Sequence, residues 1–191
     1  MRLHTSLAAV GLAAALTFSL AGCFSPAPSP GTGESAPPAS TTDPATGDTI
    51  TGTGYSFNAP EGWVIPGSAP AGVDTVVADP ADIDGFTDNI NVLLSPAGAL
   101  TADQVEVAGP AELESVGATN IEVRPRLNVA GSESAHLTAQ LSSGGATYLF
   151  DQYYATNADQ TYVITFSFSD TESQQDRETL AESVLASWTW I

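Results

Sequence analysis

The second half of the chain alternates apolar and polar residues, which is typical of β-strands with one buried face. Four such runs lie between residues 119 and 169, and short turns rich in Gly, Ser and Asn separate them. Short turns join neighbouring strands in antiparallel order. The pattern therefore predicts a four-stranded antiparallel meander. Pro125 interrupts the first run, which indicates an edge strand or a β-bulge.

A helix is predicted from Thr101 to Gly117. Thr101 is suited to the N-cap, and Gln104 three residues later completes a capping box. Gly109-Pro110 should kink or break this helix, because proline lacks the backbone N–H and its ring crowds the preceding turn. The apolar face expected to pack inward consists of Val105, Ala108, Leu113 and Val116.

A second helix is predicted to start at Thr171, with Gln174 as its capping partner. One stripe of this helix should pack on the sheet. Its members are Arg177, Leu180, Val184, Leu185 and Trp188.

Shorter strands are expected before the first helix, at residues 55–57, from Trp63 onward, and at 73–78 and 89–94. Together these elements predict an α+β fold in which an antiparallel sheet of about six strands packs against helices. We expect this single globular domain to span residues 54–191.

The N-terminus has the layout of a secretory signal, with Arg2 before an apolar run from Leu7 to Leu20. Leu20-Ala21-Gly22-Cys23 resembles the bacterial lipobox. The resemblance implies that residues 1–22 are removed and that the Cys23 thiol carries diacylglycerol and palmitate-type chains. Acyl chains of this kind give stable attachment to a membrane. Cys23 is the only cysteine, so no disulfide can form within the chain.

Residues 24–53 are dominated by Pro, Gly, Ser and Thr, and Phe24 and Ile50 are their only large apolar residues. Such a segment buries too little apolar surface to offset its chain entropy. We therefore expect residues 23–53 to form a lipidated cysteine followed by a disordered tether. The predicted location is the extracytoplasmic face of a bacterial cell membrane.

Charge restricts the partners of this chain. It has 22 Asp and Glu against 4 Lys and Arg, a formal net charge of −18, and no lysine. This charge repels nucleic-acid phosphates and anionic lipid headgroups, so nucleic-acid binding is excluded and membrane attachment must come from Cys23.

Candidate catalytic chemistry is sparse. A Ser-His-Asp triad would need His136, the only histidine after the signal, which the alternation places on the polar face of its strand. No Gly-x-Ser-x-Gly elbow, no Cys/His cluster and no phosphate loop with its lysine occurs. We therefore expect no catalytic residue, no metal and no cofactor.

An acidic loop offers the one candidate metal site. Asp79, Asp82, Asp84 and Asp88 lie around Gly85, and hard oxygen ligands at this density suit Ca²⁺. On an EF-hand template, however, Pro80 and Asn91 occupy the places of the two key anionic ligands. The preferred interpretation is an acidic surface loop.

Arg124 and Arg126 should project to the same side of one strand, where they offset neighbouring acids or dock an anionic ligand. A cluster of aromatic residues in the last strands is expected to be core, although a cavity for an apolar ligand is an alternative. This cluster contains Tyr148, Phe150, Tyr153, Tyr154, Tyr162, Phe166 and Phe168.

The order of the elements resembles the Mog1/PsbP-like α/β sandwich, and several short pieces resemble the LpqN/LpqT group of actinobacterial lipoproteins. These pieces are residues 54–57, Pro60-Glu61-Gly62-Trp63, residues 88–92, Val129-Ala130-Gly131, residues 162–166 and Ser187-Trp188. They are turns and core positions, so the resemblance implies fold and location but no catalytic residue.

The sequence thus favours a non-enzymatic binding or accessory module of the cell envelope, with an unknown protein or small-molecule partner. Two alternatives stay open: a small hydrolase that uses paired carboxylates, and a carrier of an apolar ligand.

Overall fold

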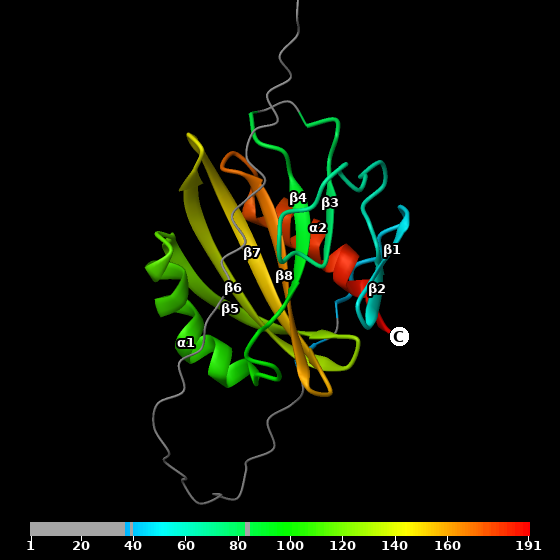
Figure 1. The fold of residues 1–191 in the computed structure, drawn as a ribbon, viewed down its shortest axis with the longest axis vertical. Helices are drawn as coiled ribbons and strands as arrows, with labels where there is room; N and C mark the ends of the chain where they lie inside the picture. Colours follow the sequence, from blue (N-terminus) through cyan, green and yellow to red (C-terminus); the bar gives the residue numbers. More distant parts are fainter. Residues whose placement is uncertain (1–36, 39, 83–84) are drawn as a thin grey trace, which may run out of the picture.

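The predicted meander forms most of the larger sheet in the computed structural model, which describes residues 37–38, 40–82 and 85–191 (Figure 1). This sheet is antiparallel, with the strand order β3-β4-β8-β7-β6-β5. The hairpin of β3 and β4 extends the meander at β8. The strands are β3 (Thr75–Ala78), β4 (Asn89–Leu94), β5 (Thr119–Val129), β6 (Ser132–Ser143), β7 (Ala146–Asn157) and β8 (Gln160–Ser169).

A second, three-stranded sheet lies beside the first and has the order β1-β2-β9. Its strands are β1 (Thr49–Gly52), β2 (Tyr55–Asn58) and β9 (Thr189–Trp190). β1 falls within the segment that we predicted to be a disordered tether, so this prediction is wrong for residues 49–52. Ile50 is buried, and antiparallel pairing with β2 satisfies the backbone of β1.

The predicted strand at Trp63 is also absent. Trp63 is buried, but its neighbour Val64 makes only an isolated bridge to Ala78. Asp74, the residue before β3, links the two sheets by accepting hydrogen bonds from Thr53 N (2.9 Å) and Tyr55 Oη (2.8 Å). Burial opposes the charge of Asp74, but these hydrogen bonds outweigh it and lower the pKa of the carboxyl.

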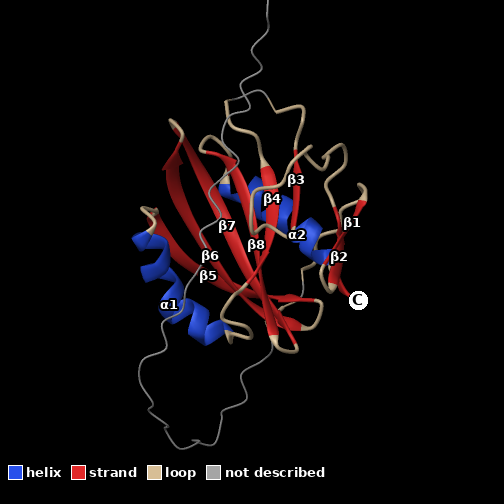
Figure 2. Ribbon diagram, viewed as in Figure 1, coloured by secondary structure: helices blue, strands red, loops and turns tan. Residues whose placement is uncertain are grey.

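Two helices cover opposite faces of the larger sheet (Figure 2). α1 (Ala102–Ser115) packs on β5 and β6, and α2 (Gln174–Ala186) lies on the other face, near β2 and β7. Each face has its own apolar cluster. α+β architecture and the four-strand meander are therefore confirmed.

α1 begins as predicted, because Thr101 and Gln104 form the capping box. It does not break at Gly109-Pro110, and Pro110 lies within the helix. Gly109 has a packing role, since a Cβ there would lie 2.5 Å from Leu137 Cδ1 on β6. The inward face differs from the predicted one in two positions. It consists of Ala102, Val105, Gly109 and Leu113, whereas Val116 is exposed.

α2 starts two residues later than predicted. Its N-cap is Ser173, whose hydroxyl accepts a hydrogen bond from Asp176 N, so the predicted pairing of Thr171 with Gln174 is wrong. Its buried residues are Arg177, Ala181, Val184 and Leu185, which confirms most of the predicted stripe.

β5 reverses its two faces at Pro125. The register with β6 shifts between Arg124 and Leu127, as expected for a β-bulge. Before the bulge, Ile121 packs toward α1; after it, Leu127 and Val129 join the cluster under α2. Strict alternation would have kept all three residues on one face.

The face under α2 contains a buried ionic network. Asp151 on β7 accepts hydrogen bonds from His136 Nε2 on β6 (2.9 Å) and from Arg177 Nε on α2 (2.9 Å). All three residues are buried: His136 is 4% exposed, Asp151 is 1% exposed and Arg177 is 6% exposed. His136 does lie on the predicted polar face, but α2 covers that face and the histidine is not in solvent. Its ring stacks on Tyr153 at 4.1 Å between centroids.

Replacing Asp151 should strongly destabilise the fold. Asp151→Asn leaves the guanidinium of Arg177 buried without its counter-charge, and breaking a buried pair in this way costs about 3–5 kcal/mol. We expect a loss of this size in the free energy of unfolding, measured by urea denaturation at pH 7.

Glu122→Gln is the matched control, because it removes one carboxylate that lies 3.5 Å from Arg124 and is 63% exposed. Its effect should stay below about 1 kcal/mol. Equal losses in both variants would contradict the role of the buried network.

Asp151 should also make the stability depend on acid pH. Burial raises the pKa of this carboxyl, but the hydrogen bonds from His136 and Arg177 outweigh burial and hold the pKa below its ordinary value of 3.8. A lowered folded-state pKa contributes stability above the unfolded-state value, and this contribution is lost as pH falls through the folded-state value. The difference in unfolding free energy between wild type and Asp151→Asn should therefore narrow below about pH 4. Urea titrations from pH 7 to pH 3 measure it, and a constant difference would refute the assignment.

Candidate functional site

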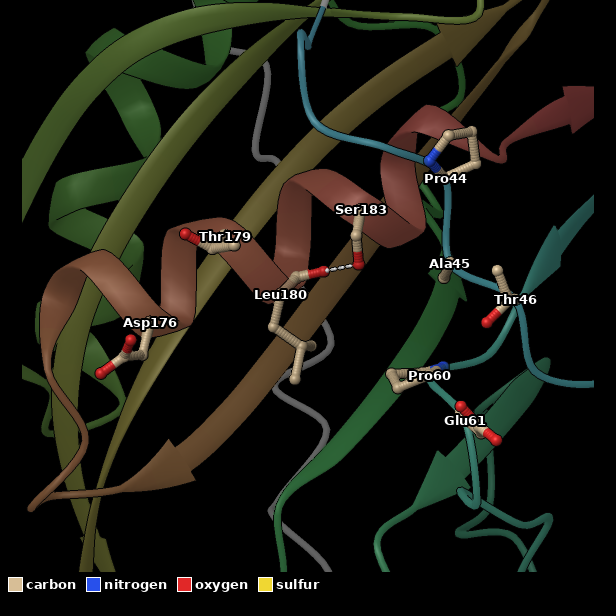
Figure 3. Close-up of a pocket in the computed structure, with 9 residues that line it drawn as sticks. All are labelled: Pro44, Ala45, Thr46, Pro60, Glu61, Asp176, Thr179, Leu180 and Ser183. Carbon is tan, nitrogen blue, oxygen red and sulfur yellow. Dashed lines mark hydrogen bonds between the residues drawn. The ribbon is translucent and has the colours of Figure 1, made fainter.

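A groove of about 360 Å³ runs along the outer side of α2, facing away from the larger sheet (Figure 3). One wall is a single stripe of α2, in which residues three or four apart lie above one another. The other wall comes from the chain before β1 and from the turn after β2. The lining residues are Pro44, Ala45, Thr46, Pro60, Glu61, Asp176, Thr179, Leu180 and Ser183.

The segment before β1 is held on α2 by polar contacts near its start and in its middle. Ser40 and Thr42 donate their hydroxyls to Glu182 Oε2 at 3.1 and 3.0 Å. Ala45 N donates to the carbonyl oxygen of Ser183 at 2.8 Å, and Ala45 is buried. We call residues 40–48 the strap. The strap was also assigned to the disordered tether, and this prediction is wrong for residues 40–48, which hydrogen-bond to α2 and to the chain that follows β2.

The groove combines an apolar floor with acidic ends. Leu180 is half-buried, and Pro44, Ala45 and Pro60 contribute apolar surface from the opposite wall (Figure 3). Asp176 and Glu61 are exposed carboxylates on opposite walls. Asp176 accepts a hydrogen bond from the Ser173 hydroxyl at 2.6 Å, which orients its carboxylate at the first turn of α2. This surface suits an apolar group that is flanked by positive charge.

Arg124 and Arg126 do not form one site, and the prediction that they project to the same side is wrong. The bulge at Pro125 directs them to opposite faces of the sheet. Arg124 pairs with Glu178 of α2 at 2.9 Å.

Arg126 instead contacts α1. It makes a bidentate pair with Glu106, at 2.6 and 2.7 Å, and also pairs with Asp103 and with Glu133. These contacts raise the pKa of the guanidinium, first through the hydrogen bond to Glu106. Neither arginine is available to an anionic ligand, because carboxylates of the same chain already neutralise both.

His136 has no access to a substrate. The residue is 4% exposed, and its Nε2 is engaged by Asp151, whose own second oxygen is engaged by Arg177. Burial and the charge of Asp151 raise the pKa of the neighbouring Tyr153 hydroxyl, which disfavours a phenolate there. This arrangement is that of an internal structural contact, in which a histidine and an arginine compensate one buried carboxylate.

The acidic loop uses its carboxylates to hold its own backbone. Asp79 accepts from Ala81 N, Asp82 from Asp88 N, and Asp88 from Ser169 N. Asp84, the remaining acid of the loop, lies outside the described residues.

Among residues 37–38, 40–82 and 85–191, no group of three or more His, Cys, Asp and Glu side chains could hold a metal ion. Glu112 is a half-buried acid on α1 whose pKa is raised by burial.

Cys23 and the signal segment lie outside the described residues, so the lipidation site stays a prediction. Within the part of the chain that the structure describes, neither helix is both long enough and apolar enough to cross a bilayer.

Sequence reasoning did not identify the groove. Asp176, Leu180 and Ser183 follow helical spacing, which could have revealed a second stripe beside the buried one. The opposite wall had no such signal, because the strap belongs to a segment whose composition is typical of disorder.

The chain matches no family model and no curated protein sequence. Its structure is similar to that of LpqN from Mycobacterium tuberculosis, with a TM-score of 0.52 and 14% identity over 74% of this chain and 88% of LpqN. A protein from Bacteroides thetaiotaomicron gives a TM-score of 0.50 and 15% identity over 76% of this chain. This chain spans only about half, 48%, of that protein.

Saccharomyces cerevisiae Mog1p, a Ran-binding protein, gives a TM-score of 0.47 at 14% identity and covers 72% of this chain and 90% of its own. At such identities the likeness concerns architecture alone. The likeness to LpqN confirms, at the level of the fold, the resemblance inferred from the order of the elements: this chain has a Mog1/PsbP-like α+β fold.

Proposed function

We propose that this chain is a lipid-anchored extracytoplasmic protein whose domain acts as a non-enzymatic binding module of the cell envelope. The observation that carries the proposal is the use of its charged groups. All three arginines of the described chain, and its one histidine, form internal contacts with carboxylates. The groove beside α2 is by contrast open and apolar with acidic ends, which is a surface for binding rather than for bond cleavage.

The N-terminal sequence supports the anchor. The charged start, the apolar run and Leu20-Ala21-Gly22-Cys23 together have the layout of a lipoprotein signal. The acidic domain adds no attraction to anionic lipid, so the acyl chains on Cys23 would provide the attachment. LpqN, which has the same fold, is described as involved in cell envelope biogenesis, and this agrees with an envelope role for the present chain.

Substitution of Cys23 should release the protein from the membrane. Cys23→Ser lacks the thiol that takes up diacylglycerol, and no other cysteine can replace it. We expect metabolic labelling with a fatty acid to mark the wild type and not the variant, and fractionation to move the variant from the membrane to the soluble fraction. The control is Ser25→Ala, a change of similar size two residues away, which should keep both the label and the location. Undiminished membrane retention of Cys23→Ser would contradict the anchor.

The non-enzymatic part of the proposal has a separate test. Purified protein would be incubated with cell-envelope fractions, and the products followed by mass spectrometry. We expect no turnover. Activity that disappears on a single substitution of an exposed carboxylate would contradict a pure binding role.

A further inference from the structure

We propose that the groove beside α2 binds a cationic segment of a partner protein, with an apolar side chain of that segment seated on Leu180 and flanking Lys or Arg residues at Asp176 and Glu61. This inference rests on the proposed binding function and specifies the chemistry of the partner.

The charge of the domain favours a cationic partner. The chain carries 22 acids, and the ion pairs of its three described arginines involve six of them. The remaining carboxylates give the surface a negative potential that steers positively charged ligands and repels anionic ones. The groove has negative charge of its own, because Asp176 and Glu61 lie on its opposite walls. Neither carboxylate has an ion-pair partner among the described cations.

The apolar floor would contribute binding free energy through burial of apolar surface, in addition to the attraction between charges. Leu180 is only half-buried in a groove that two prolines also line, so a partner side chain that covers it removes further apolar surface from water. Full burial of one such side chain contributes roughly 1.5–3 kcal/mol. Exposed charge pairs contribute less, about 0.2–1 kcal/mol each, and they mainly set orientation and partner choice.

The groove lies next to the chain that leads to Cys23. The strap forms one wall, and Ser40 lies seventeen positions after Cys23, with sixteen residues between them. A chain of that length spans at most about 60 Å when fully extended. If Cys23 is acylated, the groove therefore stays within this distance of the bilayer, where extracytoplasmic segments of membrane proteins and other anchored proteins are concentrated. The partner would be a protein segment at or near the same membrane.

The test uses the mature, lipidated chain in detergent micelles and a fluorescent twelve-residue peptide with two central leucines between lysines. We expect saturable binding by fluorescence anisotropy that weakens as salt is raised. A peptide with serine in place of leucine should bind at least about tenfold more weakly. A peptide with glutamate in place of lysine should not bind.

Glu61→Lys should weaken binding of the leucine–lysine peptide about five- to tenfold, because it replaces an attraction with a repulsion. Among the residues that the structure describes, Glu61 has no side-chain hydrogen-bond or ion-pair partner that the substitution would remove. Glu114→Lys is the matched control, since it makes the same charge change at an exposed position of α1, on the opposite face. It should leave the affinity within about twofold. Leu180→Gln should weaken binding without moving the urea midpoint as far as Asp151→Asn.

The outcomes separate this inference from the proposed function. Equal weakening by Glu61→Lys and Glu114→Lys, or equal binding of the leucine and serine peptides, would show attraction to the whole acidic surface and overturn the groove as a site. Absence of peptide binding, or preference for the glutamate peptide or for phosphatidylglycerol vesicles, would overturn the cationic partner. Neither result would affect the Cys23 labelling test, and loss of the label would not alter the affinity of the groove for the peptide.

Discussion

The fold depends on one carboxylate that lies where water cannot reach it. Asp151 sits in the middle of β7 at 1% exposure, and a charge in that position is strongly unfavourable unless it is paired and hydrogen-bonded. His136 supplies one bond from the neighbouring strand, and Arg177 supplies the other from α2. The requirement that Asp151 be compensated therefore fixes the rotation and the axial position of α2 on the sheet. Apolar packing alone would tolerate small slips of the helix, whereas the geometry of two hydrogen bonds at 2.9 Å does not.

The positions of the other arginines follow from a local feature of β5. The bulge at Pro125 exchanges the two faces of the strand, so Arg124 meets α2 and Arg126 meets α1. Each helix is thus joined to the edge strand by its own ion pair, in addition to its apolar stripe. Because Arg124, Arg126 and Arg177 are the only lysine or arginine residues among those described, the chain uses all of its described permanent positive charge to hold helices on the sheet. The surface is left acidic as a direct consequence, and the electrostatic preference for cationic partners derives from the way in which the fold is stabilised.

Much of the architecture could be predicted from periodicity. The four runs between residues 119 and 169 became β5 to β8, and the box of Thr101 and Gln104 begins α1, because alternation and capping are local signals. The errors arose where a tertiary contact overrides the local signal. β1 has the composition of a linker but gains order by pairing with β2, and Pro110 remains in α1 while Gly109 lets the helix approach Leu137. His136 lies on the expected face of its strand, but it is buried because α2 covers that face. No local sequence pattern specifies where α2 packs on the sheet.

The groove depends on the same tertiary contacts. Its helical wall is the stripe of α2 that remains outside once Arg177 turns the other stripe toward Asp151. Its second wall exists because Glu182 and Ser183, on that outward side, hold the strap through Ser40, Thr42 and Ala45. A ligand in the groove would touch both walls and so add contacts between α2 and the strap. Binding there would consequently favour the docked strap over a detached one, since a ligand shifts an equilibrium toward the state that it binds more tightly.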